Sequence, residues 1–168
     1  PARIVSIGSS AGGGLALMMA LPQDGDLPGD PELAKTPAHA RAAVSWFGVT
    51  DFLKAKREAS RTEEHFAALF NTSQEGERQY EIVSPVWHMR RRTDKVPVLL
   101  VHGNGDKTVP YVQSEWMKAE ADRLGWPVEF MPVKNMRHGF QPTGTGDITP
   151  PLSEIWKRTL EFILKNNP

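Results

Sequence analysis

Cysteine is absent from this 168-residue sequence. Its absence excludes disulfides, a thiol nucleophile and cysteine-ligated zinc, and it leaves the compartment open between the cytoplasm and the outside of the cell. The sequence also lacks an excess of either charge, because 20 basic residues balance 20 acidic ones. Without a basic patch we expect no nucleic-acid or anionic-membrane partner. No apolar run approaches the roughly 20 residues that a membrane-spanning helix needs, so the sequence predicts a soluble protein.

Short apolar segments that predict buried strands recur along the chain. They cover residues 4–7, 42–47, 96–102 and 128–133. Helical patterns lie at residues 11–21, from Pro110 to Gly125, and from Thr149 to the C-terminal proline. The first of these is apolar nearly all round, which predicts a buried helix, and the last has one apolar face. Strands that alternate with helices predict an α/β fold with a mostly parallel sheet of about four strands, flanked by helices.

The length of the chain favours a single domain, residues 1–168. Within it, residues 51–92 are polar and rich in charge, and we interpret them as a helical insertion with short helices near 63–70 and 79–83. Residues 22–37 are rich in proline, glycine and aspartate, which predicts a surface loop. The acidic residues of this loop lack the spacing of a calcium-binding loop, so no metal is expected.

The segment Gly8-Ser9-Ser10-Ala11-Gly12 fits the pattern G-x-S-x-G between a predicted strand and a predicted helix, which is the context of a nucleophile elbow. Such a tight turn lifts the serine hydroxyl out of the sheet and requires small neighbours, hence Gly8 and Gly12. The helix that follows points its N-terminus at Ser10, so the N–H of Ala11 is the expected oxyanion donor. A plain glycine-rich connection stays open as the alternative. A phosphate-binding loop needs a lysine close by, which this segment lacks.

A serine hydroxyl becomes a useful nucleophile only when a base removes its proton, so an acid and a histidine should follow Ser10 in that order. Asp106 lies in the loop after the third predicted strand, and His138 lies in the loop after the fourth. Because the carboxyl ends of parallel strands meet at one edge of a sheet, we expect these residues to come together as nucleophile, acid and base. Asp51, after the second strand, is the alternative acid. His102 closes its strand and is expected to make a structural hydrogen bond.

Five segments together resemble the α/β-hydrolase fold: "GSSAGG", "WFGVTDF", "SPVWHM", "PVLLVHGNGDKTVP" and "RHGF". More narrowly, the chain is similar to bacterial esterases of the acetyl-xylan and feruloyl esterase-like group, and the similarity covers nearly all of it. The resemblance implies a serine esterase for short acyl or carbohydrate-linked esters, with Ser10, Asp106 and His138 as catalytic residues and no cofactor.

The resemblance also implies that the insertion at residues 51–92 is cap-like and lies near a substrate pocket. Aromatic residues are the candidates to line such a pocket, although buried packing is the other explanation for large rings. They are Trp46, Phe47, Trp87 and Phe140.

Members of the family carry further strands before the nucleophile, and a His-Gly-Gly-type loop that supplies a second oxyanion N–H. The 168 residues contain no such loop, so the chain looks like the C-terminal portion of such an enzyme. Loss of one donor lowers the rate about a hundred- to thousandfold. The strand at residues 4–7 becomes a sheet edge, and we expect an exposed apolar edge there unless an N-terminal half or a second copy of the chain covers it.

Two other functions stay open. A serine peptidase of the prolyl-oligopeptidase type shows similar segments, but such peptidases usually carry an aromatic residue at the position of Ala11. A catalytically inactive hydrolase-like module could serve binding or assembly. Such a module would have no physical reason to retain Ser10, Asp106 and His138 together.

Overall fold

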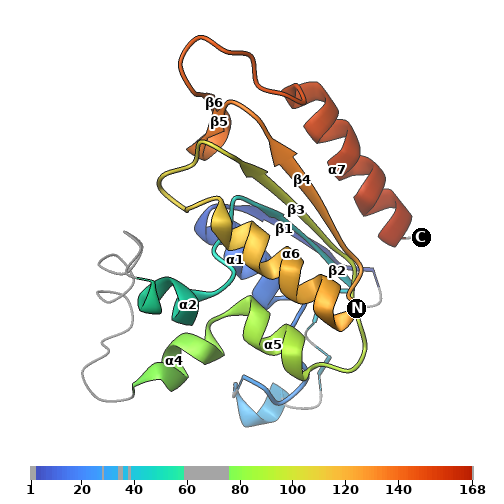
Figure 1. The fold of residues 1–168 in the computed structure, drawn as a ribbon. Coiled ribbons are helices and arrows are strands. Elements are labelled where there is room, and N and C mark those ends of the chain that lie inside the picture. The colour runs from blue at the N-terminus through green and yellow to red at the C-terminus, as the bar shows by residue number, and fades with distance from the viewer. Residues whose placement is uncertain (1–2, 28, 34–35, 38, 59–75, 168) are drawn as a thin grey trace.

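The computed structural model describes residues 3–27, 29–33, 36–37, 39–58 and 76–167 (Figure 1). Its centre is a parallel sheet of four strands in the order β1-β2-β3-β4. The strands are β1 (Val5–Ser9), β2 (Ala42–Trp46), β3 (Val98–Gly103) and β4 (Val128–Val133). The predicted α/β fold with about four parallel strands is therefore confirmed.

The strands differ in burial according to their place in the sheet. β2 and β3 are mostly apolar and are buried along their whole length, as is typical of inner strands of a parallel sheet that is covered on both faces. Among the described strands β1 pairs with β2 alone, and it continues past the predicted end at Ile7 because Ser9 still pairs with Trp46. The apolar edge expected at this strand is exposed in the structure, with 45% of Ile7 accessible.

Helices cover both faces of the sheet (Figure 1). α1 (Ala11–Met18), α5 (Pro85–Arg91) and α6 (Val112–Leu124) lie on one face, and α7 (Leu152–Asn166) lies on the other. The core therefore has two parts. The first includes Leu17, Met89, Leu100 and Met117. The second includes Val44, Leu99, Ile155 and Phe162.

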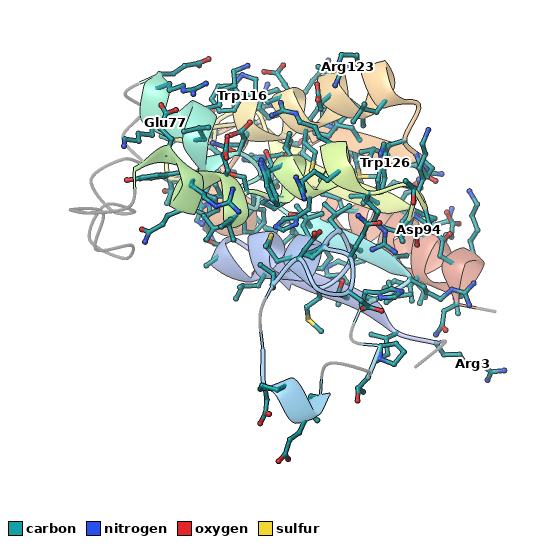
Figure 2. The ribbon with its side chains drawn as sticks, turned by 90° about the horizontal axis from the view of Figure 1, so that it is seen from below. Arg3, Glu77, Asp94, Trp116, Arg123 and Trp126 are labelled. Carbon is teal, nitrogen blue, oxygen red and sulfur yellow. The ribbon has the colours of Figure 1, made fainter. Side chains whose placement is uncertain are left out.

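α6 shows how local sequence sets a helix end. The helix begins at Val112, two residues after the predicted start at Pro110, and it ends at Gly125, whose φ of 65° is the left-handed conformation that glycine adopts easily. After the helix the chain turns into the core at Trp126, whereas Arg123, in the last turn of α6, points to solvent (Figure 2).

Two helices expose large apolar residues, and burial was predicted for the first of them. α1 contacts the sheet on one side only, so the predicted all-round burial is wrong: Leu15 is 65% exposed. The apolar stripe of α7 is wider than the part of the sheet that it covers. Ile155 is buried, but Trp156 is 56% exposed, and Leu160 is also exposed. No helix in the described part of the chain is long and apolar enough to cross a membrane.

The predicted insertion divides into three described helices. These are α2 (Phe52–Arg57), α4 (Glu77–Ile82) and α5. α4 occupies the helix predicted near residues 79–83, and the helix predicted at 63–70 lies outside the described residues. Val86 and Met89 of α5 are buried against the sheet-facing core, so this helix belongs to the main helical layer. A cap-like role of the remaining segment stays a prediction.

Candidate active site

Ser10 occupies the turn between β1 and α1 in an unusual backbone conformation. Its φ of 54° and ψ of −125° lie in a region that residues other than glycine rarely adopt. Three hydrogen bonds hold this turn: the N–H of Ser10 donates to the carbonyl of Trp46 (2.9 Å), and the carbonyl of Ser10 accepts from the N–H groups of Gly13 (2.9 Å) and Gly14 (3.2 Å). The strained turn places Ser10 at the carboxyl edge of the sheet. Ala11 is the first residue of α1, so its N–H has no partner within the helix.

The two glycines of the motif have different surroundings. A Cβ on Gly8 would lie 2.1 Å from the carbonyl oxygen of Gly12, because the first turn of α1 passes directly over β1. A Cβ on Gly12 would meet no atom within 4 Å. The expectation that both residues must be small is therefore confirmed for Gly8 and wrong for Gly12. Gly12 contributes to the close contact only through its backbone carbonyl, which lies over Gly8.

The loop after β4 brings His138 to the serine. This loop forms a small antiparallel pair, β5 (Met136–Arg137) and β6 (Gln141–Pro142), around the 3₁₀ helix η2 (His138–Phe140). Nε2 of His138 lies 2.8 Å from Oγ of Ser10, and Nδ1 lies 2.7 Å from Oδ2 of Asp106. When Nδ1–H donates to the carboxylate, Nε2 is free to accept the hydroxyl proton of Ser10. The structure thus brings together the three residues that the sequence singled out.

The carboxylate of Asp106 is almost entirely buried, with 1% of the side chain exposed. Its Oδ1 accepts hydrogen bonds from the N–H groups of Thr108 (2.8 Å) and Val109 (3.0 Å). Burial by itself raises the pKa of Asp106, but hydrogen bonds from His102, His138 and Thr108 outweigh it and lower the pKa below its usual value. The carboxylate is therefore ionised at neutral pH.

Asp51, the alternative acid, has a different task. Its side chain accepts a hydrogen bond from the N–H of Lys54 (2.8 Å) and caps the N-terminus of α2. Asp106, not Asp51, contacts His138.

The four candidate aromatic residues do not form one pocket. Phe47, at a left-handed φ of 43°, packs its ring edge-on against His138 (4.9 Å) and Phe140 (5.0 Å). Trp46 is buried beneath α7, where its Nε1–H donates to Thr159 (3.3 Å). The ring of Trp87 instead contacts Arg91 and His88 on its own helix. Of these rings, Phe47 is therefore the one that contacts His138, and Phe140 packs against both Phe47 and Trp46.

The sequence did not predict the contact between His102 and the buried carboxylate. Nε2 of His102 lies 3.4 Å from Oδ2 of Asp106. The segment "HGNGD" contains the signal in retrospect, since a histidine at a strand end and an aspartate four residues later can meet across a tight loop.

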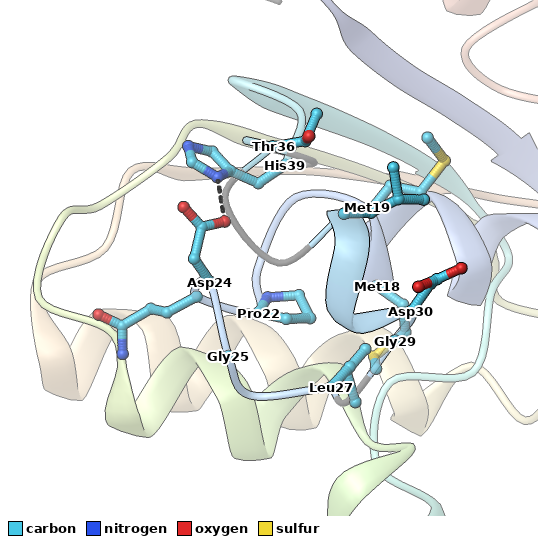
Figure 3. A pocket seen from close by; sticks show the side chains of 12 residues that line it. Met18, Met19, Pro22, Asp24, Gly25, Leu27, Gly29, Asp30, Thr36 and His39 are labelled. Atoms are coloured by element: carbon cyan, nitrogen blue, oxygen red, sulfur yellow. Dashed lines mark hydrogen bonds and ion pairs between the residues drawn. The ribbon is translucent and has the colours of Figure 1, made fainter.

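A separate cavity of about 510 Å³ lies at the end of α1 opposite to Ser10 (Figure 3). Met18, Met19 and Leu27 contribute apolar lining, and Oδ1 of Asp24 lies 3.4 Å from Nδ1 of His39 at its rim. The nearby 3₁₀ helix η1 (Pro31–Leu33) adds Leu33 to the wall. The residues that the structure describes include no group of three or more side chains suited to holding a metal ion.

Comparisons with known proteins agree with this fold. An esterase from the planctomycete Thermogutta terrifontis, solved with bound propionate, is 27% identical with a TM-score of 0.73 over 98% of this chain and 56% of its own. A puromycin-hydrolysing peptidase from Mycobacterium tuberculosis is 28% identical with a TM-score of 0.74, over 99% of this chain and 22% of its own. Methylphloroacetophenone synthase from Cladonia uncialis is 35% identical over 78 residues, which are 46% of this chain and 3% of that protein.

This chain spans about half the length of the Thermogutta esterase. The model of the BD-FAE family matches residues 1–120, which include the strained serine turn, the first three strands and the buried aspartate. The chain therefore belongs to the BD-FAE family, an esterase family of the α/β-hydrolase type.

Proposed function

We propose that this chain hydrolyses carboxylic esters, with Ser10 as nucleophile, His138 as general base and Asp106 as the acid that orients the histidine. One observation carries the proposal: a continuous series of hydrogen bonds joins Ser10 to His138 (2.8 Å) and His138 to Asp106 (2.7 Å). These residues lie far apart in the sequence, and the series begins at a strained turn that packing must maintain.

In the proposed reaction, Oγ of Ser10 attacks the ester carbonyl while Nε2 of His138 takes the hydroxyl proton. The negative carbonyl oxygen of the tetrahedral intermediate faces the N–H of Ala11 at the start of α1. The C–O bond to the alcohol then breaks, and the proton on His138 passes to the departing alkoxide. A water molecule, deprotonated by His138, finally hydrolyses the acyl-serine. Asp106 stays ionised throughout and stabilises the imidazolium.

The proposed substrates are esters of short carboxylic acids. The Thermogutta esterase was solved with propionate and with butyrate, at 27% identity in both cases. In this chain the buried ring of Phe47 packs against His138, and the half-buried ring of Phe140, which packs on Phe47, offers apolar surface for a short chain. Removing this surface should raise KM more than it lowers kcat.

A second candidate function is peptide or amide hydrolysis. The 28% identity to the puromycin-hydrolysing peptidase over 99% of this chain favours it. The same hydrogen-bonded residues could attack an amide, but an amine is a poorer leaving group than an alcohol. The two functions therefore separate on paired substrates that share an acyl group.

The test measures turnover of p-nitrophenyl butyrate and of the matching p-nitroanilide. The neighbouring serines supply matched variants, since Ser9→Ala removes a hydroxyl one residue from the proposed nucleophile. We expect hydrolysis of the ester that is retained in Ser9→Ala and lost in Ser10→Ala. Faster turnover of the anilide would favour the peptidase. Equal rates in wild type and Ser10→Ala would overturn the proposal and favour an inactive hydrolase-like module.

A further inference from the structure

His102 lies at the end of β3 with its side chain completely buried, and both ring nitrogens have partners. Nδ1 is 2.8 Å from Oγ of Ser114 on α6. Nε2 is 3.0 Å from the carbonyl oxygen of Val109 and 3.4 Å from Oδ2 of Asp106. The ring therefore stands between a helix on one side and the loop that carries Asp106 on the other.

These contacts specify where the proton of His102 resides. The carbonyl of Val109 and the carboxylate of Asp106 can only accept hydrogen bonds, so Nε2 carries the proton, which is donated to Val109 and faces Oδ2 of Asp106 at an N–O distance of 3.4 Å. Nδ1 is then an acceptor, and the hydroxyl of Ser114 donates to it. The hydroxyl of Ser114 could pair with either tautomer, so the acceptors at Nε2 fix the tautomer and Ser114 anchors the ring to α6.

We propose that His102 is a positioning residue: it holds the carboxylate of Asp106 in the orientation that His138 requires. This inference rests on the proposed esterase function. The backbone N–H groups of Thr108 and Val109 hold Oδ1. Oδ2 faces His138, and the N–H of His102 is its second donor.

The same N–H of His102 also holds the carbonyl of Val109, whose own N–H binds Oδ1 of Asp106. The loop from residue 106 to 109 is therefore fixed from both sides. Without this donor, Oδ2 loses a partner in a buried environment, and both the carboxylate and its loop gain freedom to rotate away from His138. The ring of Tyr111, another titratable group, lies 5.7 Å from the ring of His102.

The test compares His102→Gln with His102→Asn. Glutamine places its amide nitrogen near the position of Nε2, whereas asparagine is one bond shorter and reaches only the position of Nδ1. We expect His102→Asn to lower kcat for p-nitrophenyl butyrate about tenfold with little change in KM, as for the loss of a hydrogen bond to a charged group. His102→Gln should recover most of this loss.

The pH profile separates positioning from mere structural support. Without the donor, the carboxylate of Asp106 turns away from His138 and stabilises the imidazolium less, so the acidic limb of kcat/KM moves to lower pH in His102→Asn. Ser114→Ala should move the limb in the same direction but less, because the ring of His102 then loses its hydrogen bond to α6 while its Nε2–H still faces Asp106.

Failure of the positioning role can be distinguished from failure of the esterase function. Loss of activity in Ser10→Ala, together with wild-type kcat and an unchanged limb in both His102→Asn and Ser114→Ala, would overturn the positioning role and leave the esterase intact. If Ser10→Ala shows that the esterase proposal fails, the downfield NMR signal of the proton between His138 and Asp106 still tests the inference. We expect it in the wild type and expect it weakened in His102→Asn, and an identical signal would overturn the proposal. If His102→Asn does not fold, the same measurements on Ser114→Ala decide.

Discussion

Gly8→Ala should separate the geometry of the serine turn from the mere presence of its hydroxyl. The new Cβ would lie 2.1 Å from the carbonyl oxygen of Gly12 and 2.4 Å from its carbonyl carbon. Real Cβ atoms essentially never approach within 3.0 Å, so the first turn of α1 must move away from β1 by about 0.9 Å. Both neighbours are backbone atoms, and no side-chain rotation can relieve the contact.

Such a shift changes the positions of the groups proposed to react. The first turn of α1 follows Ser10 and contains the N–H of Ala11, so the proposed nucleophile and the proposed oxyanion donor move together. Misplacing reacting groups by about 1 Å costs roughly a hundredfold in rate. Overpacking lowers the free energy of unfolding by about 1–3 kcal/mol. We therefore expect kcat/KM for p-nitrophenyl butyrate to fall about a hundredfold in a protein that still folds.

Gly12→Ala is the matched control for Gly8→Ala. Its Cβ meets no atom within 4 Å, so kcat/KM should stay near the wild-type value. Because alanine is a better helix former than glycine, the free energy of unfolding should rise by up to about 1 kcal/mol. Urea denaturation and steady-state kinetics on both variants provide the measurements. Wild-type kcat/KM in Gly8→Ala, or equal losses in the two variants, would refute the reasoning.

Two further predictions concern stability and association. Glu120 on α6 accepts hydrogen bonds from Arg123 and Arg90, which lower its pKa from 4.5 to about 2. Its stabilising effect is therefore complete above pH 4.5 and lost as the pH falls through about 2. Both arginines are largely exposed, so Glu120→Gln should lower the free energy of unfolding by only about 1 kcal/mol at pH 7. The loss should be smaller at pH 3, and an equal loss at both pH values would contradict this reasoning. At the exposed edge strand, we expect chain 1–168 to self-associate in sedimentation velocity and Ile7→Lys to reduce this, because a charge on a sheet edge opposes pairing. A wild-type chain that stays monomeric at high concentration would count against the predicted association.

Local sequence was sufficient to predict the fold class and the three hydrogen-bonded residues of the candidate site, Ser10, Asp106 and His138. Apolar runs such as residues 98–101 are buried wherever they lie in a parallel sheet, so their number and their alternation with helices predict the architecture. The carboxyl ends of parallel strands share one edge, so Ser10, Asp106 and His138 could be expected to meet because each follows a strand. The need for glycine at position 8 follows from the tight turn itself.

Tertiary structure alone decided how far burial extends and which polar groups meet. The periodicity of α7 shows that it has an apolar stripe, but only the width of the sheet beneath it determines that Ile155 is buried and Trp156 is exposed. Both Asp51 and Asp106 follow strands, and only the packed loops direct one to the N-terminus of α2 and the other to His138. The contact of His102 with Asp106 likewise depends on how the loop folds back on β3. Sequence periodicity records what each segment tends to bury, whereas partners and distances depend on segments remote in the chain.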